Sequence, residues 1–190
     1  MIRTISSFIL LSTLLSCSRS YTPKPKGQLR IEFPSAQYAY FNEDDLPYAF
    51  AVSHLAVIEM LPNDSAAYWL NIDYPALNAK IYCSYKSITP GTLDEYTTES
   101  RRLVERAVKQ AAAITEKAYE NSASGVYGMF YAVEGETASP VQFWLTDSVS
   151  HFFRGALYYR HKTDPDSIAP VTDYIKNDVT ELIQTFYWKK

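Results

Sequence analysis

The stretch that most constrains the fold is residues 138–160, ASPVQFWLTDSVSHFFRGALYYR. Two runs of aromatic and β-branched residues, Val141–Thr146 and His151–Tyr159, flank the turn-forming residues Asp147-Ser148-Val149-Ser150. This pattern predicts an antiparallel hairpin. Successive side chains of a strand point to opposite faces, and both runs place apolar residues on each face. We therefore expect the hairpin to lie at the centre of a sheet that is covered on both sides.

The amino-terminal segment has the features of a secretion signal. Arg3 is the only charged residue before Cys17, and the apolar run Ile5–Leu15 is too short to span a bilayer. The run ends in Leu14-Leu15-Ser16-Cys17, which resembles the lipobox of bacterial lipoproteins. We predict a lipoprotein signal peptide at residues 1–16 and lipidation of Cys17 by acyl chains such as palmitate. The alternative is an ordinary cleaved signal in which Cys17 has no role.

The residues after the lipobox predict a tether and a single domain. Residues 17–28 include the alternating prolines and lysines of TPKPKG, which favour an extended, solvated segment. Residues 29–190 are expected to form one domain. Some surface lipoproteins carry an acidic export signal directly after the lipidated cysteine, and its absence after Cys17 favours a periplasm-facing protein. We expect attachment to the outer membrane rather than the inner. Because lipidation consumes Cys17, Cys83 is expected to have no disulfide partner.

The composition supports a packed core and excludes some functions. Apolar residues make up 47% of the chain, with 16 Tyr and 9 Phe. The formal net charge of −3 gives no basic excess, so nucleic-acid binding is not expected. The chain contains no glycine-rich phosphate loop, and we expect no cofactor. The acidic cluster Glu43-Asp44-Asp45 precedes Pro47 without a nearby histidine, which indicates an exposed loop rather than a metal site.

The alternation of apolar and polar residues, together with turn-forming residues, predicts five strands before the first helix. A turn is predicted at Pro62–Ser65, and a second hairpin is predicted around Pro75. These strands are Leu29–Phe33, Tyr48–Val52, Ala56–Leu61, Tyr68–Tyr74 and Ala79–Tyr85.

A capping box formed by Thr92 and Glu95 predicts the start of a long helix, which alanine-rich spacing extends to about Glu120. A strand follows at Gly125–Val133. After a polar loop at His161–Ser167, Pro170 is expected in the first turn of a closing helix. That helix has an apolar face made by Val171, Tyr174, Ile175, Val179, Leu182, Ile183 and Phe186.

This order of elements predicts an α+β fold. A largely antiparallel sheet would be packed by one long central helix and one carboxy-terminal helix. The arrangement is similar to the PsbP/Mog1-like sandwich at the level of the fold, which does not by itself indicate a function.

No residue pattern indicates an enzyme. The three histidines have no zinc-binding spacing, and neither Ser139 nor Ser148 lies in a GxSxG context. Cys83, His151 and Asp147 could be written as a catalytic triad with Cys83 as the nucleophile. However, Cys83 lies on the apolar side of its strand, which indicates a small buried residue rather than a nucleophile. We expect no catalytic and no metal-binding residues.

Three charged residues near the predicted strands need partners. Asp73 and Asp147 could form a carboxylate pair, although hydrogen bonds to the adjacent backbone are the favoured role for each. Arg154 lies on a largely apolar strand and is expected to pair with Asp147 or Glu134.

Aromatic residues outside the regular segments are candidates for an interface. Core packing accounts for most of the Tyr and Trp residues, but an interface role is more open for a few. These are Tyr21, Tyr38, Tyr40, Tyr187 and Trp188.

Several blocks resemble one protein family, the gliding motility lipoproteins GldD, in the same order along the mature chain. The blocks are YTPKPKG after Cys17, the Pro47-Tyr48 segment, WLNIDYP, AKIYCSYK, VYGMFYAVEG, SPVQFWLTDS, HFFRGALYY and PVTDYIKNDVTELIQTFYWK. The resemblance implies a lipid-anchored component of the cell envelope that serves the gliding apparatus and the linked type IX secretion system. The family carries no established catalytic residues, so only Cys17 carries over, as the lipidated residue.

The leading hypothesis is therefore a protein without enzymatic activity that is anchored in the membrane by its lipid and docks on proteins of the gliding or secretion machinery. An alternative is a periplasmic module that binds a small apolar or glycan ligand. A hydrolase that uses Cys83 or His151 is the third possibility.

Overall fold

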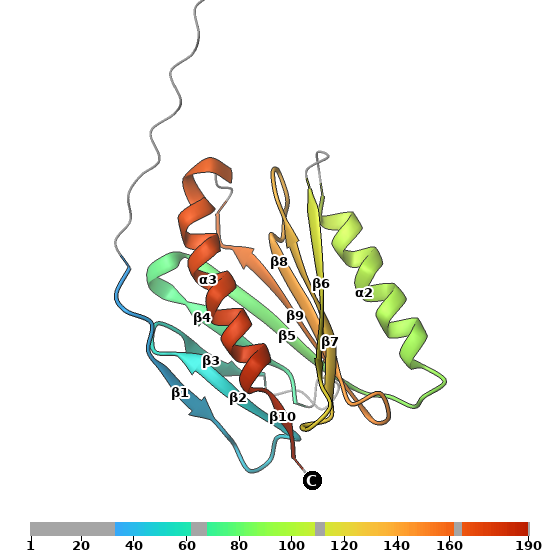
Figure 1. Cartoon of the computed structure of the whole chain (residues 1–190). Coiled ribbons are helices and arrows are strands. Elements are labelled where there is room, and N and C mark those ends of the chain that lie inside the picture. The colour runs from blue at the N-terminus through green and yellow to red at the C-terminus, as the bar shows by residue number, and fades with distance from the viewer. Residues whose placement is uncertain (1–32, 62–67, 109–112, 162–164, 190) are drawn as a thin grey trace, which may run out of the picture.

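The computed structural model describes residues 33–61, 68–108, 113–161 and 165–189 (Figure 1). Its main element is a seven-stranded sheet in which every neighbouring pair of strands is antiparallel. In spatial order the strands are β3 (Val57–Met60), β4 (Leu70–Tyr74), β5 (Ala79–Ser87), β9 (His151–Tyr159), β8 (Val141–Thr146), β7 (Val126–Val133) and β6 (Ile114–Asn121). A short 3-10 helix, Pro75–Leu77, joins β4 to β5, so the predicted hairpin around Pro75 is confirmed.

A smaller sheet and two helices cover the large sheet. The smaller sheet contains β1 (Tyr38–Phe41), β2 (Tyr48–Ser53) and β10 (Tyr187–Trp188) in the order β1-β2-β10. This sheet and α3 (Pro165–Thr185) lie on one side of the large sheet, and α2 (Leu93–Ala107) lies on the other (Figure 1). The described residues therefore form the expected α+β arrangement.

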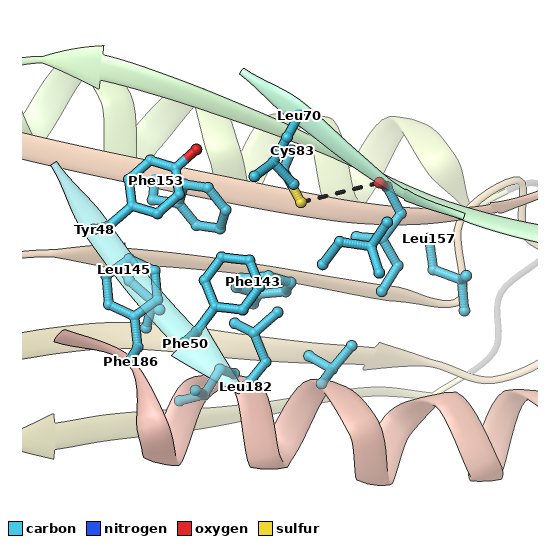
Figure 2. Packing of buried hydrophobic residues seen from close by; sticks show 14 of the residues in the cluster. Tyr48, Phe50, Leu70, Cys83, Phe143, Leu145, Phe153, Leu157, Leu182 and Phe186 are labelled. Atoms are coloured by element: carbon cyan, nitrogen blue, oxygen red, sulfur yellow. Dashed lines mark hydrogen bonds between the residues drawn. The ribbon is translucent and has the colours of Figure 1, made fainter. Parts of the chain in front are cut away.

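The main core lies between the large sheet and the layer of α3 and β2 (Figure 2). Phe153 is fully buried at its centre, with ring centroids 4.7 Å from Tyr48 and 5.4 Å from Phe186. Gly155 makes room for a neighbouring ring, because a Cβ atom there would lie 2.3 Å from Cε1 of Phe143. A second, smaller cluster on the other side packs Val104 of α2 against the sheet.

The predicted central hairpin is confirmed. Strands β8 and β9 pair from Gln142↔Ala156 to Thr146↔Phe152, and β9 is the middle strand of the large sheet. In the turn, Oδ1 of Asp147 accepts hydrogen bonds from the backbone N–H groups of residues 149, 150 and 151 at 2.9, 2.8 and 2.8 Å. A single carboxylate oxygen thus stabilises the turn between β8 and β9.

The predicted long helix is wrong in its second half. Helix α2 ends at Ala107, whose carbonyl oxygen accepts hydrogen bonds from Thr137 Oγ1 (3.0 Å) and the backbone N–H of Ala138 (2.9 Å). Residues 114–121 instead form β6, which pairs with β7 over its full length. Pairing with the next strand in the chain, β7, has outweighed a helical residue pattern, since propensity is only a weak local preference.

The predicted start of α2 is correct, but its capping box is not formed. Thr92 is the N-cap residue, yet its side chain makes no capping hydrogen bond. Its Oγ1 instead donates to the carbonyl oxygen of Thr89 at 3.1 Å and accepts from the N–H of Thr89 at 3.0 Å. This threonine therefore stabilises the preceding turn rather than the first turn of the helix.

The closing helix begins earlier than predicted. Helix α3 starts at Pro165, so the polar loop is shorter and Pro170 lies inside the helix rather than in its first turn. Strands β1 and β10 were not predicted, because they are short and are defined mainly by pairing with β2. Residues 29–32 of the predicted strand Leu29–Phe33 fall outside the described residues. The whole of the predicted turn Pro62–Ser65 does so as well. Phe33 is not in a strand.

Candidate interaction surface

The structure does not bring together Cys83, His151 and Asp147. Cys83 pairs with Gly155, whereas His151 pairs with Ser87, so four residues separate them along the sheet, or about 13 Å. The thiol of Cys83 is 2% exposed, lies 4.0 Å from the carbonyl oxygen of Ile81 (Figure 2), and has a pKa that burial raises. Such a thiol is a poor nucleophile.

His151 and Ser139, which were also considered as catalytic candidates, have structural partners. Nδ1 of His151 shares a hydrogen bond of 2.6 Å with the hydroxyl of Tyr85. The side chain of Ser139 is buried, and its hydroxyl donates to the carbonyl oxygen of Val141 at 3.4 Å.

The considered pairing of Asp73 with Asp147 is wrong. Asp73 is buried on β4 and accepts hydrogen bonds from Nη2 of Arg160 through both carboxylate oxygens, at 2.7 and 2.6 Å. Asp147 lies near the opposite end of β9, where its predicted bonding to the adjacent backbone is confirmed. Burial raises the pKa of Asp147, but the three backbone N–H donors outweigh this effect and hold the pKa below its usual value.

Arg154 has a different partner from those predicted. Its Nη2 donates to Oε1 of Gln142 at 2.5 Å, across the β8–β9 pair, rather than to Asp147 or Glu134. An amide oxygen thus satisfies one guanidinium N–H without neutralising its charge.

Helix α2 covers only part of its side of the large sheet. It packs Tyr96 against Phe152, with ring centroids 5.7 Å apart, and Val104 against Tyr131 on β7. Beside it, towards β4, the same side of β5 and β9 remains partly exposed. We call this surface the open face; it consists of Lys80, Tyr82, Lys86, Arg154 and Tyr158.

Two tyrosines form the apolar part of the open face. Tyr82 is 50% exposed and Tyr158 is 38% exposed. Their rings meet edge to face, with centroids 5.6 Å apart. Partly exposed tyrosines on a rigid sheet offer a large contact area at a low cost in conformational entropy, which is why such residues are enriched in protein interfaces.

The predicted interface aromatics are mostly structural. Tyr38 on β1 donates a hydrogen bond to Asp178 of α3 at 2.9 Å, and Trp188 on β10 stacks on His151 with ring centroids 4.9 Å apart. Tyr187 pairs with Ala49 of β2. Tyr40 is 67% exposed and stays a candidate, while Tyr21 lies outside the described residues.

A groove of about 600 Å³ lies at one end of the large sheet. It is formed by residues 132–140, the end of β9 and the first turns of α3. Its lining is mixed, with Glu134, Arg160 and Lys176 beside Tyr158 and Ala169. The volume falls in the range of small-molecule sites, although such sites are usually lined mainly by apolar groups.

Comparison with known proteins identifies the family. The family model described as gliding motility lipoprotein GldD matches residues 18–188. The chain belongs to the GldD family. As a lipoprotein family, GldD implies attachment to the cell envelope through a lipid. In the part of the chain that the structure describes, no helix has the length and apolar character to cross a membrane.

The fold is similar to that of a PsbP protein. The solution structure of cyanobacterial PsbP (CyanoP) from Synechocystis sp. PCC 6803 aligns with a TM-score of 0.50 and 11% identity, over 87% of this chain and 99% of that chain. This confirms the predicted PsbP-like α+β fold and, at such low identity, carries no function with it. No match is found among curated protein sequences.

Proposed function

We propose that this GldD-family protein is a non-enzymatic, lipid-anchored component of the gliding and type IX secretion apparatus that acts by docking on other envelope proteins. Membership of the GldD family gives the setting. The observation that carries the docking role is the open face, where Tyr82 and Tyr158 remain exposed beside the part of the sheet that α2 covers. In this proposal Cys17 holds the protein on the outer membrane, facing the periplasm.

The experiment is complementation of a deletion strain with the double variant Tyr82→Ser, Tyr158→Ser. We expect normal protein levels and membrane attachment, but gliding and type IX secretion reduced at least about tenfold, as for loss of aromatic interface anchors. The control is Tyr40→Ser, which removes a more exposed tyrosine from β1, outside the open face. If the double variant glides and secretes like the wild type, docking through this face is excluded.

The alternative, binding of a small apolar or glycan ligand, is favoured by the groove beside α3. The variant Ala169→Trp places an indole in this groove and leaves the open face untouched. Because Tyr158 lines the groove as well as the open face, the comparison uses the single variant Tyr82→Ser. Loss of function in Ala169→Trp together with normal function in Tyr82→Ser would support the ligand-binding role. The docking role predicts the opposite pair of results.

A further inference from the structure

The cations of the open face are not all balanced by carboxylates. Lys80 pairs with Glu59 at 2.7 Å, and the adjacent Arg160 pairs with Asp73 at 2.6 Å. Neither Lys86 nor Arg154 takes part in any ion pair among the described residues. Nζ of Lys86 lies 5.3 Å from the centre of the Trp69 ring. Two positive charges thus lie unpaired on a protein whose net charge is −3.

Arg154 is the more unusual of the two. It is partly buried, and burial lowers the pKa of its guanidinium, which means that the surroundings disfavour the charge. Its contact is the neutral oxygen of Gln142. An arginine has five N–H donors, and no carboxylate bonds to those of Arg154; Glu99 of α2 stabilises the charge only from a longer distance.

The amide beside Arg154 also has unused donors. Gln142 is 1% exposed, and its Nε2 has no hydrogen-bond partner. Because the Oε1 atom of the same amide accepts from Arg154, the unfilled groups of Arg154 and Gln142 are donors, whereas Asn71 of β4, opposite Tyr82, has an unpartnered acceptor, Oδ1. Unfilled donors around a partly buried cation match an acceptor that carries negative charge.

We infer that the open face binds an acidic side chain of a partner protein, with its carboxylate at Arg154 and its neighbouring apolar groups against Tyr82 and Tyr158. This inference rests on the proposed docking function. An anionic membrane surface is the weaker fit, because recognition of acidic lipids uses clusters of four or more exposed cations. Here Glu59 and Asp73 neutralise Lys80 and Arg160, which leaves two.

The test is crosslinking in cells that carry the full lipidated chain with a photoreactive amino acid at position 82. We expect a protein product, and the peptide attached to it should carry Asp or Glu within a few residues of the crosslink. Combining the probe with Arg154→Gln should lower the yield about tenfold or more, because this change removes one member of a charge pair that docking takes out of water. Lys86→Glu should also lower the yield, because it places a negative charge on the face that the acidic side chain approaches. Lys86→Arg, which keeps the charge, is the matched control.

The other possible results of the crosslinking experiment separate failure of this inference from failure of the proposed function. A captured lipid, or a captured peptide without acidic residues, would overturn the inference. An unchanged crosslinking yield in Lys86→Glu would also overturn the inference. Because Lys86 is exposed, this variant should fold and remains informative even if Arg154→Gln does not fold. If a probe at position 40 gives crosslinked proteins and the probe at position 82 gives none, the docking site lies elsewhere than the open face. The proposed docking function would then still hold. No protein product from either position in gliding cells would remove the proposed function as well.

Discussion

Asp178 is a buried acid at the junction of three elements. It lies on α3, is 4% exposed, and accepts a hydrogen bond from the hydroxyl of Tyr38 on β1. Tyr74 of β4 and Ser53 of β2 also face it, so its neighbours are hydroxyl groups rather than cations. Burial raises the pKa of this carboxyl, and the three hydroxyls only partly oppose that effect. The residue therefore makes stability depend on pH.

The first prediction concerns Asp178→Asn. Because the folded-state pKa of Asp178 is raised, its contribution to stability is complete below the unfolded-state pKa of about 3.9 and is lost as the pH rises through the folded-state value. We expect the free energy of unfolding of the variant to rise relative to the wild type as the pH increases from about 4 towards neutrality. Urea denaturation in a series of buffers measures this difference.

Tyr38→Phe serves as the companion variant. The hydrogen bond from Tyr38 lowers the pKa of Asp178, so its removal should make the loss of stability with rising pH greater. If wild type and Asp178→Asn keep a constant difference at every pH, the buried carboxyl does not titrate in this way.

At the scale of elements, the β8–β9 hairpin and its neighbours β5 and β7 were predictable, whereas β6 was not. The hairpin is encoded by adjacent residues, because two strand-forming runs flank a turn that Asp147 holds through its own backbone neighbours. The boundary of α2 with β6 is not local. It depends on Thr137 and Ala138, which contact the carbonyl oxygen of Ala107 from about thirty residues further along the chain.

The prediction at this scale is that Gly155→Ala destabilises the hairpin. A Cβ atom at this position would lie 2.3 Å from the Phe143 ring, and the fully packed core leaves that ring little room to move. We expect a loss of about 1–3 kcal/mol in the free energy of unfolding, as for overpacking elsewhere. Thermal or urea unfolding followed by tryptophan fluorescence measures it.

Gly91→Ala provides the control for this substitution. The nearest atom to a Cβ at Gly91 is Oγ1 of Thr89 at 3.9 Å, so the change should stay within about 0.5 kcal/mol of the wild type. Equal stabilities for the two variants would mean that the Phe143 ring is not constrained as described.

At the scale of the whole molecule, the proposed function assigns anchoring and docking to separate parts of the chain. The open face lies on the large sheet, whereas Cys17 lies outside the described residues and before the segment that leads to β1. The lipid would keep the protein at a membrane, and the open face would select the partner. Loss of either is expected to abolish gliding, but by different routes.

The prediction for the whole molecule is that Cys17→Ala moves the protein from the membrane fraction to the soluble fraction of the envelope and abolishes gliding. Stable anchoring needs more than one acyl chain, and the variant has no site for any. Cell fractionation and gliding speed measure the two effects. Cys83→Ala is the control, since its buried thiol serves as packing, and it should keep both properties. Full complementation by Cys17→Ala would exclude the anchoring role.

The sequence by itself was sufficient for the features whose determinants lie close together in the chain. The alternation in β5, β8 and β9, the turn at Asp147, the burial of Cys83 and the α+β class all follow from side chains within a few residues of one another. The predicted lipidation of Cys17 has the same local origin, in the apolar run and the small residue that precede it.

Tertiary structure alone decided the pairings between distant residues. The bond between Arg160 and Asp73 joins residues 87 positions apart, and Tyr38 reaches Asp178 across 140. The end of α2 likewise depends on residues 137 and 138, which bond to the carbonyl oxygen of Ala107 from about thirty residues further along the chain. The physical reason is that a charge or an edge backbone group is stabilised by whichever partner the fold brings within bonding distance, and residue patterns along the chain do not specify that partner.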